Sequence, residues 1–379
     1  MKQKLTLDRR GFLRSAAALA GATAATTAAA AVPAAAAVPA AAGTAGARAA
    51  ATSTPIRGKG TELVLLGTAA GPVPMKGRVG ISSALVVDGR AYLVDVGHGA
   101  FDQLGRAGVE PDSLDSIFVT HMHSDHLADL WTLFWLRFGG VNPLTHAVDV
   151  YGPGPAGALP EPSSGEETPV ISPENPTPGL SDFIGTSMAA TAYDLNLRMR
   201  DENWPDPRDL VRAHDIEVPD VGADPLTNVA PPMEPFPVMS DDRVSVTAVL
   251  VQHPPVFPSF AFRFDTEHGS VVFSGDTTIT ENVVTLARGA DVLVHEAIDL
   301  DVVERYGNLT EEQLQHHRAG HADVRELGAH AQRAGVPRLV LSHLAPGTVA
   351  LPDESWRRKA SRGFDGEVVV GTDLMRLDV

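Results

Sequence analysis

Three histidines and one aspartate fall within six residues, in the run His121-Met-His123-Ser-Asp125-His126. An apolar, strand-like stretch at 116–120 ends directly before them, so they lie on the loop at the end of a strand. Alternate residues His121 and His123 can turn toward one metal ion, and Asp125 and His126 toward a second. Imidazole and carboxylate groups suit Zn²⁺ best, although Mn²⁺ and Fe²⁺ accept the same ligands. The run therefore predicts a site for two divalent metal ions.

The composition narrows the chemistry further. The chain has 379 residues, enough for one large domain or two ordinary ones, and no cysteine. Disulfides, thiolate ligands and cysteine nucleophiles are therefore excluded, and any metal ligand must be His, Asp or Glu. Beyond the first 49 residues the chain holds 24 basic and 46 acidic residues, a net charge of −22. This negative charge would repel nucleic-acid phosphates, so it argues against nucleic-acid binding driven by phosphate attraction.

The N-terminal 50 residues have the composition of an export signal. Arg9-Arg10 and Phe12-Leu13 precede a weakly apolar run at 15–32, and alanine and proline dominate to about residue 51. Paired arginines before a mild apolar region are typical of the twin-arginine route, which predicts an extracellular or periplasmic protein. Alanine and threonine bury little apolar area, so we expect no stable membrane insertion.

Hydrophobic patterning predicts strands, then helices, then strands and helices again, in the residues after the signal. This order favours an α/β architecture with two packed sheets and helices outside. The expected strands are 62–66, 81–87, 91–96, 116–120, 148–151, 244–251, 259–264, 271–274, 291–295, 339–342 and 367–370. The expected helices are 101–107, 127–138, 181–201, one that a capping box opens at Thr310, and 322–334.

The stretch 152–240 differs from its surroundings. It holds 16 of the 29 prolines and carries four basic residues against 15 acidic ones. Such a segment is typical of an insertion or lid laid over a domain, without an independent core. We therefore treat 51–379 as one domain with an acidic, proline-rich insertion at 152–240.

Several further motifs, in the same order along the chain, resemble those of the metallo-β-lactamase superfamily, and within it the ribonuclease Z and arylsulfatase-like branch. The similarity spans about 61 to the C-terminus, apart from the insertion. The motifs that carry it are Leu66-Gly67-Thr68 with Gly71 and Pro74, Asp95-Val-Gly97, His121 to His126, His253, Ser274-Gly275-Asp276-Thr277, and Ser342-His343-Leu344.

The resemblance implies a four-layer αββα sandwich with a two-metal site at its edge. It implies that one metal binds His121, His123 and His253, and that the other binds Asp125, His126 and His343. Asp276 would bridge the two ions. Homodimers are common in this branch, so a homodimer is the expected assembly.

Two metal ions a few ångströms apart lower the pKa of a shared water, which then attacks an ester as metal-bound hydroxide. Asp125 would hold the hydroxide's proton and orient the attack, and Asp95 would hydrogen-bond a ligand histidine. The resemblance implies that His321, at a predicted helix start, assists the leaving group as general acid. The alternative for His321 is a capping or surface role. His295-Glu296 also matches the branch, with a purely structural role as the alternative.

The metal-site residues predict a hydrolase for a small ester, and the resemblance implies that this ester is anionic, either a phosphodiester or an aryl sulfate. The same ligands would serve a lactonase or another carboxylic-ester hydrolase, which is the alternative. A non-catalytic binding module on the same fold is disfavoured, because all seven ligand positions are filled. Transfer-RNA processing is disfavoured by the export signal and the acidity, so no nucleic-acid partner is expected.

Overall fold

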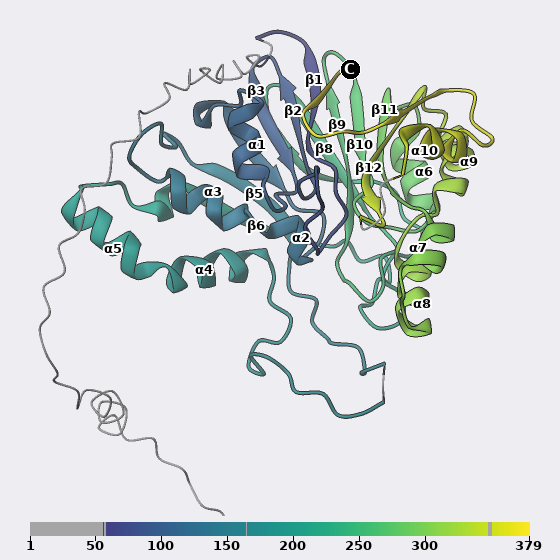
Figure 1. Ribbon diagram of the computed structural model, residues 1–379. Helices are drawn as coiled ribbons and strands as arrows, with labels where there is room; N and C mark the ends of the chain where they lie inside the picture. The colour runs from purple at the N-terminus through teal and green to yellow at the C-terminus, as the bar shows by residue number, and fades with distance from the viewer. Residues whose placement is uncertain (1–55, 57, 164, 348–350) are drawn as a thin grey trace, which may run out of the picture. The chain divides into compact units, whose positions relative to one another are not determined.

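The computed structural model describes residues 56, 58–163, 165–347 and 351–379, and these build two seven-stranded sheets (Figure 1). The expected export signal at 1–50 lies outside the described residues. The first sheet has the order β14-β1-β2-β3-β4-β5-β6. Its strands are β1 (Thr61–Gly67), β2 (Ser82–Val87), β3 (Arg90–Val94), β4 (Leu114–Phe118), β5 (Val148–Pro153), β6 (Val211–Ile216) and β14 (Met375–Asp378).

The second sheet has the order β13-β12-β11-β10-β9-β8-β7. Its strands are β7 (Phe236–Ser240), β8 (Val244–Leu250), β9 (Phe260–Thr266), β10 (Ser270–Phe273), β11 (Val292–Ile298), β12 (Arg338–Ala345) and β13 (Glu367–Val370). Strands β3 to β6 are parallel in the first sheet, and β10 to β13 are parallel in the second. The carboxyl ends of parallel strands meet at one edge, where ligand sites of α/β sheets commonly lie.

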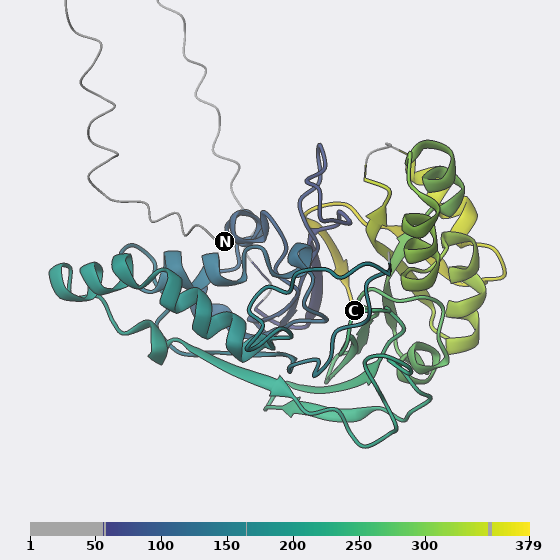
Figure 2. The same ribbon diagram turned by 90° about the horizontal axis from the view of Figure 1, so that it is seen from below.

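Helices cover the outer face of each sheet, which completes the four layers (Figures 1 and 2). On the first sheet lie α1 (Ala100–Arg106), α2 (Ser124–Leu127), α3 (Leu130–Arg137), α4 (Leu180–Ala190) and α5 (Ala192–Asp201). On the side of the second sheet lie α6 (Glu281–Ala287), α7 (Leu300–Tyr306), α8 (Glu311–Gly320), α9 (Val324–Ala334) and α10 (Asp353–Ala360).

The core has one apolar cluster between the two sheets and one beneath each helical layer. Phe118, Phe262 and Phe264 meet edge to face between the sheets, with ring centroids 4.9 to 5.5 Å apart. All three side chains are fully buried, and the apolar area that they remove from water stabilises the fold. The predicted αββα sandwich is confirmed. Among the described residues, no helix has both the length and the apolar character needed to cross a bilayer.

The predicted helix at 181–201 is two helices, because the chain bends at Thr191. The Thr191 hydroxyl donates to the Ser187 carbonyl at 2.9 Å and accepts the Trp131 indole N–H at 3.1 Å. Threonine competes in this way with the backbone ladder of a helix. The predicted helix at 127–138 corresponds to α3, which begins three residues later, at Leu130. The short helix α2 precedes it and shares only Leu127 with the predicted range.

The segment 152–240 differs from the expected lid. It supplies β6, which pairs in parallel with β5, and β7, which pairs antiparallel with β8. Leu180, Ile184 and Leu195 are buried in the cluster beneath the first helical layer. Only two of the six residues of β6 are buried. The strand therefore lacks the hydrophobic pattern from which strands are predicted, and the sequence analysis did not predict it.

Candidate metal centre

The predicted metal-ligating side chains come from five chain segments that end at the same edge of the sandwich. His121 and His123 follow β4, and Asp125 and His126 lie in α2. The other three, His253, Asp276 and His343, come from the ends of β8, β10 and β12. The turn after β10 needs Gly275, whose φ of 59° is in the left-handed region and whose added Cβ would lie 2.6 Å from the Phe260 carbonyl oxygen.

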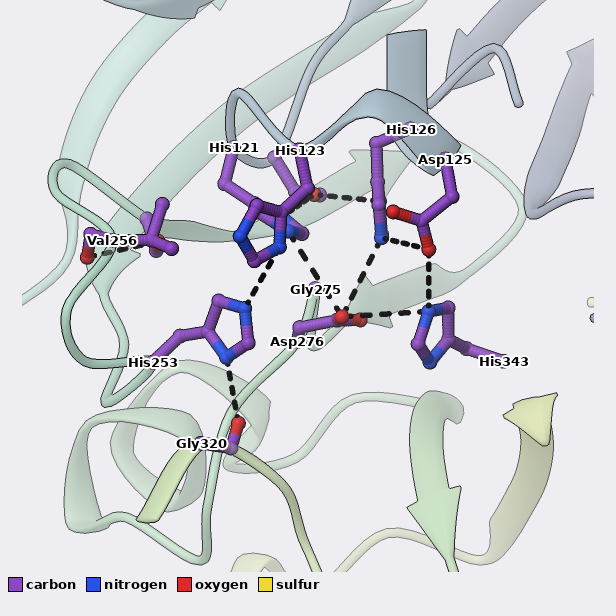
Figure 3. Close-up of polar contacts among 12 residues, drawn as sticks. His121, His123, Asp125, His126, His253, Val256, Gly275, Asp276, Gly320 and His343 are labelled. Atoms are coloured by element: carbon purple, nitrogen blue, oxygen red, sulfur yellow. Dashed lines mark hydrogen bonds and ion pairs between the residues drawn. The ribbon is translucent and has the colours of Figure 1, made fainter. Parts of the chain in front are cut away.

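The structure brings these seven side chains together in two groups (Figure 3). In each group the candidate ligand atoms all lie within 4.8 Å of one another. One group is His121, His123, His253 and Asp276, and the other is Asp125, His126 and His343. Asp276 lies between them: its Oδ2 is 3.4 Å from His343 Nε2, 3.5 Å from His126 Nε2 and 3.9 Å from His121 Nε2. The resemblance implies that these side chains lie together, and their binding of two metal ions stays a prediction.

Hydrogen bonds to Nδ1 hold three of the imidazole rings in place. His126 Nδ1 donates to Asp95 Oδ2 at 2.7 Å, and His253 Nδ1 donates to the Gly320 carbonyl at 2.7 Å. His121 Nδ1 lies 3.0 Å from Thr120 Oγ1. Each bond leaves Nε2 as the nitrogen that would bind a metal ion, because the partner of one ring nitrogen sets the role of the other. The predicted contact of Asp95 with a histidine of the cluster is confirmed.

The protonation states of Asp276, Asp125 and His253 favour metal binding. Burial alone would raise the pKa of Asp276, but the charges of His343 and His126 hold it well below its usual value. Burial also opposes ionisation of Asp125, yet the hydrogen bond from His343 and the charge of His126 lower its pKa. Burial lowers the pKa of His253 to about 3, so this ring is neutral at pH 7. Anionic carboxylates and a neutral imidazole are the forms that bind metal ions.

The polar atoms at the centre also fit divalent ions. His121 Nε2, His126 Nε2 and Asp276 Oδ1 are buried, and none has a hydrogen-bond partner among the described residues. Buried polar atoms without a partner cost free energy, and native proteins rarely keep several together. Metal coordination would satisfy all three. The His and Asp donor set suits Zn²⁺, Mn²⁺ and Fe²⁺ without choosing among them.

His321 lies beside the cluster, directly after α8. Its Nδ1 donates to Glu296 Oε1 at 3.0 Å and lies 3.9 Å from Asp276 Oδ2. Burial would lower the pKa of His321, but the charge of Glu296 and this hydrogen bond raise it to about 9. At pH 7 the ring is therefore protonated, and Nε2 carries a proton that it can donate.

Sequence reasoning missed two partners that orient the histidines, Thr120 and the carbonyl of Gly320. The sequence singles out the pair His295-Glu296 but does not show which of the two faces the site. The structure separates them: Glu296 bonds His321, whereas His295 Nδ1 donates to the carbonyl of Glu296 and its ring packs against His330.

Comparison with known proteins agrees with this architecture. The Metallo-beta-lactamase superfamily profile matches residues 77–343. A protein named Ribonuclease Z from Mycobacterium avium (strain 104) is 32% identical over 318 residues, which cover 84% of this chain and 98% of that protein. The Ribonuclease Z of Mycobacterium tuberculosis (strain ATCC 25177 / H37Ra) is 30% identical, with the same coverage of both chains.

Solved structures share the fold at lower identity. The short form of human tRNase Z has a TM-score of 0.54 and 20% identity, and the match covers 84% of this chain and 98% of that one. The metallo-beta-lactamase fold protein YhfI from Bacillus subtilis has a TM-score of 0.53 and 17% identity, covering 84% and 99%. With the profile match and the relatives, these findings confirm the predicted family: the chain belongs to the metallo-β-lactamase superfamily and is one of its metal-dependent hydrolases.

Proposed function

We propose that the protein is a dinuclear, zinc-dependent phosphodiesterase that acts on a small diester. The observation that carries the proposal is the pair of ligand groups with Asp276 between them, and with His321 and Glu296 beside them. Two ions held a few ångströms apart suit the in-line displacement of one phosphoester oxygen by another. The donor set accepts zinc but does not select it over Mn²⁺ or Fe²⁺, so the identity of the metal is tested by elemental analysis of the purified protein.

In the proposed reaction, the chain's own residues position water and move a proton. When bound, the two divalent ions supply Lewis acidity and make a nearby water more acidic. Asp125, ionised at pH 7, accepts a hydrogen bond from the attacking water and orients it toward phosphorus. As the new P–O bond forms, the attacking water loses one proton through Asp125 to solvent. The bond to the leaving alcohol breaks with its electron pair, and His321 gives its proton to the departing oxygen. Glu296 holds His321 protonated before the step.

RNA is the second candidate substrate. The name Ribonuclease Z, borne by relatives that are 30 to 32% identical over 84% of this chain, weighs against the expectation of no nucleic-acid partner. The net charge of −22 beyond residue 49 still opposes binding of a long polyanion. A small diester satisfies both observations, because it requires the same bond cleavage without an extended basic surface.

A substrate panel tests the proposal. Zinc-loaded enzyme and its Asp125→Ala variant are assayed with a bis-aryl phosphate, an aryl sulfate, an aryl carboxylic ester, a lactone and a labelled RNA. We expect rapid turnover of the bis-aryl phosphate, lost in the variant. Turnover confined to the sulfate, or to the ester or lactone, would replace the phosphodiesterase by a sulfatase or by the lactonase alternative. Faster cleavage of RNA would make RNA the substrate.

The export route and the assembly are separate proposals. The pair Arg9-Arg10 supports twin-arginine export to the periplasm or the exterior. Replacement of both arginines by lysine is expected to retain the protein in the cytoplasmic fraction, and unchanged export would reject the route. A homodimer, expected from the resembled branch, is tested by sedimentation equilibrium.

A further inference from the structure

The loop at 68–81, between β1 and β2, forms a cavity beside the metal centre. Figure 2 shows this loop in purple, projecting from the domain. The cavity has a volume of about 280 Å³. Asp125 lines this cavity and also belongs to the second ligand group, so the cavity adjoins the candidate metal centre. Its lining residues are Ala69, Ala70, Gly71, Pro72, Val73, Pro74, Met75, Gly80, His98, Ser124, Asp125 and Ala128.

Close backbone contacts fix the position of this loop relative to Asp125. The Gly71 N–H donates to Asp125 Oδ2 at 2.9 Å. A Cβ added at Gly71 would lie 2.2 Å from the Cβ of Asp125, so only glycine allows this approach. On the other side, a Cβ at Gly347 would lie 2.4 Å from Met75 Cγ. The loop thus packs between the segment that holds Asp125 and the one that follows His343.

The lining is apolar and carries no fixed cation. Of the twelve lining residues, all within the described part of the chain, seven are Ala, Pro, Val or Met, and none is Lys or Arg. The two cations of the same loop lie elsewhere: Lys76 is exposed, and Arg78 donates to the Gly371 carbonyl at 2.7 Å. Phosphate and ribose groups need cations or several hydrogen-bond donors, and the only polar side chains of this wall are His98, Ser124 and the anionic Asp125. An apolar group suits it.

The volume fits a single ring. A cavity of about 150 Å³ with an apolar lining is enough to bind benzene. The cavity beside Asp125 is larger, at about 280 Å³, so a substituted ring fits with the ester oxygen toward the metal centre. A second phosphate in this position would lie against Val73 and Met75 with no cation to pair with.

We infer that this cavity, defined by 69–75, His98, Ser124, Asp125 and Ala128, is the subsite for one ester substituent of the substrate, and that it takes a small, uncharged, apolar group such as an aryl ring. The inference rests on the proposed phosphodiesterase and narrows its substrate class. It separates an aryl diester from an RNA strand, whose substituents on both sides of the phosphate are polar and charged.

Binding of two phosphonates to the zinc-loaded enzyme tests the inference by calorimetry, without turnover. Phenylphosphonate and methylphosphonate share the same anionic head and differ only in the group that would enter the cavity. We expect phenylphosphonate to bind about tenfold more tightly or better, as burial of several carbons in a fitted pocket implies. Val73→Ser and Met75→Ser should reduce this preference to about threefold or less, with methylphosphonate affinity and metal content unchanged. Val141→Ser, at another exposed valine that lies outside the cavity, should keep the full preference.

The possible failures are distinguishable. Equal affinity of the wild-type enzyme for the two phosphonates would overturn the subsite, while turnover of any small phosphodiester would leave the phosphodiesterase intact. A phenyl preference that survives in both folded serine variants would also overturn it, because the ring would then bind elsewhere. If neither phosphonate binds and no diester is cleaved, the proposed function fails and the subsite fails with it.

Discussion

We expect the hydrogen bond between Asp95 and His126 to set the metal affinity of the second ligand group, and Asp95→Asn tests this directly. Asp95 Oδ1 accepts the Thr120 N–H at 2.8 Å, and Oδ2 accepts His126 Nδ1–H at 2.7 Å. Both side chains are almost fully buried. Asparagine keeps the shape of the side chain but replaces one carboxylate oxygen by an N–H₂ group. This group must then face either the Thr120 N–H or the His126 Nδ1–H, and both of these are donors.

If the amide nitrogen faces His126, the imidazole must move its proton from Nδ1 to Nε2. Nε2 is the nitrogen that lies 3.5 Å from Asp276 Oδ2 and is needed for the metal. Loss of such an orienting carboxylate typically costs 10- to 100-fold in metal affinity. This corresponds to about 1.4 to 2.7 kcal/mol. The site of Asp125, His126 and His343 should weaken, whereas that of His121, His123 and His253 should keep its affinity.

Competition against a chromophoric chelator measures the two affinities. At limiting free zinc we expect the Asp95→Asn variant to retain one ion per chain where the wild type retains two, with hydrolysis reduced in parallel. Asp291→Asn is the matched control, because Asp291 also holds a backbone N–H, that of Ser270 at 2.8 Å, but at the other end of β10. Two ions bound with wild-type affinity by a folded Asp95→Asn protein would refute the reasoning.

Three further perturbations have defined outcomes. His253→Ala should remove the metal of the first ligand group, and an unchanged zinc content by elemental analysis would reject His253 as a ligand. Glu296→Gln removes the charge that keeps His321 protonated, so turnover should fall about 100-fold for esters of poor leaving groups and much less for nitrophenyl esters. An equal loss for both would reject the general acid. Burial lowers the pKa of His330 to about 3 in the folded chain, against 6.5 unfolded, so the unfolded chain binds the extra proton and stability is lost as the pH falls below 6.5. His330→Leu should therefore remove about 2 kcal/mol of the stability difference between pH 7 and pH 5 in urea unfolding, and an unchanged difference would contradict this assignment.

Much of the sandwich was predictable because its strands are short, strongly apolar runs bounded by turns. The strands β1, β2 and β11 are buried along their whole length and stood out as such. The strand β6 did not, since its sequence VRAHDI is mostly polar and lies at the edge of the first sheet. An edge strand is held mainly by backbone hydrogen bonds to its neighbour. The hydrophobic pattern of its own sequence does not predict those bonds.

The sequence by itself determined the chemistry of the site. The run from His121 to His126 fixes ligand types and a spacing that suits metal ions, and the absence of cysteine removes the alternatives. Tertiary structure decided which distant groups complete it. Glu296 meets His321 across 25 residues, and Gly71 meets Asp125 across 54, because parallel strands and their loops end at one edge of the sandwich. Such contacts depend on how two sheets pack, which residue types and spacing along the chain do not encode locally.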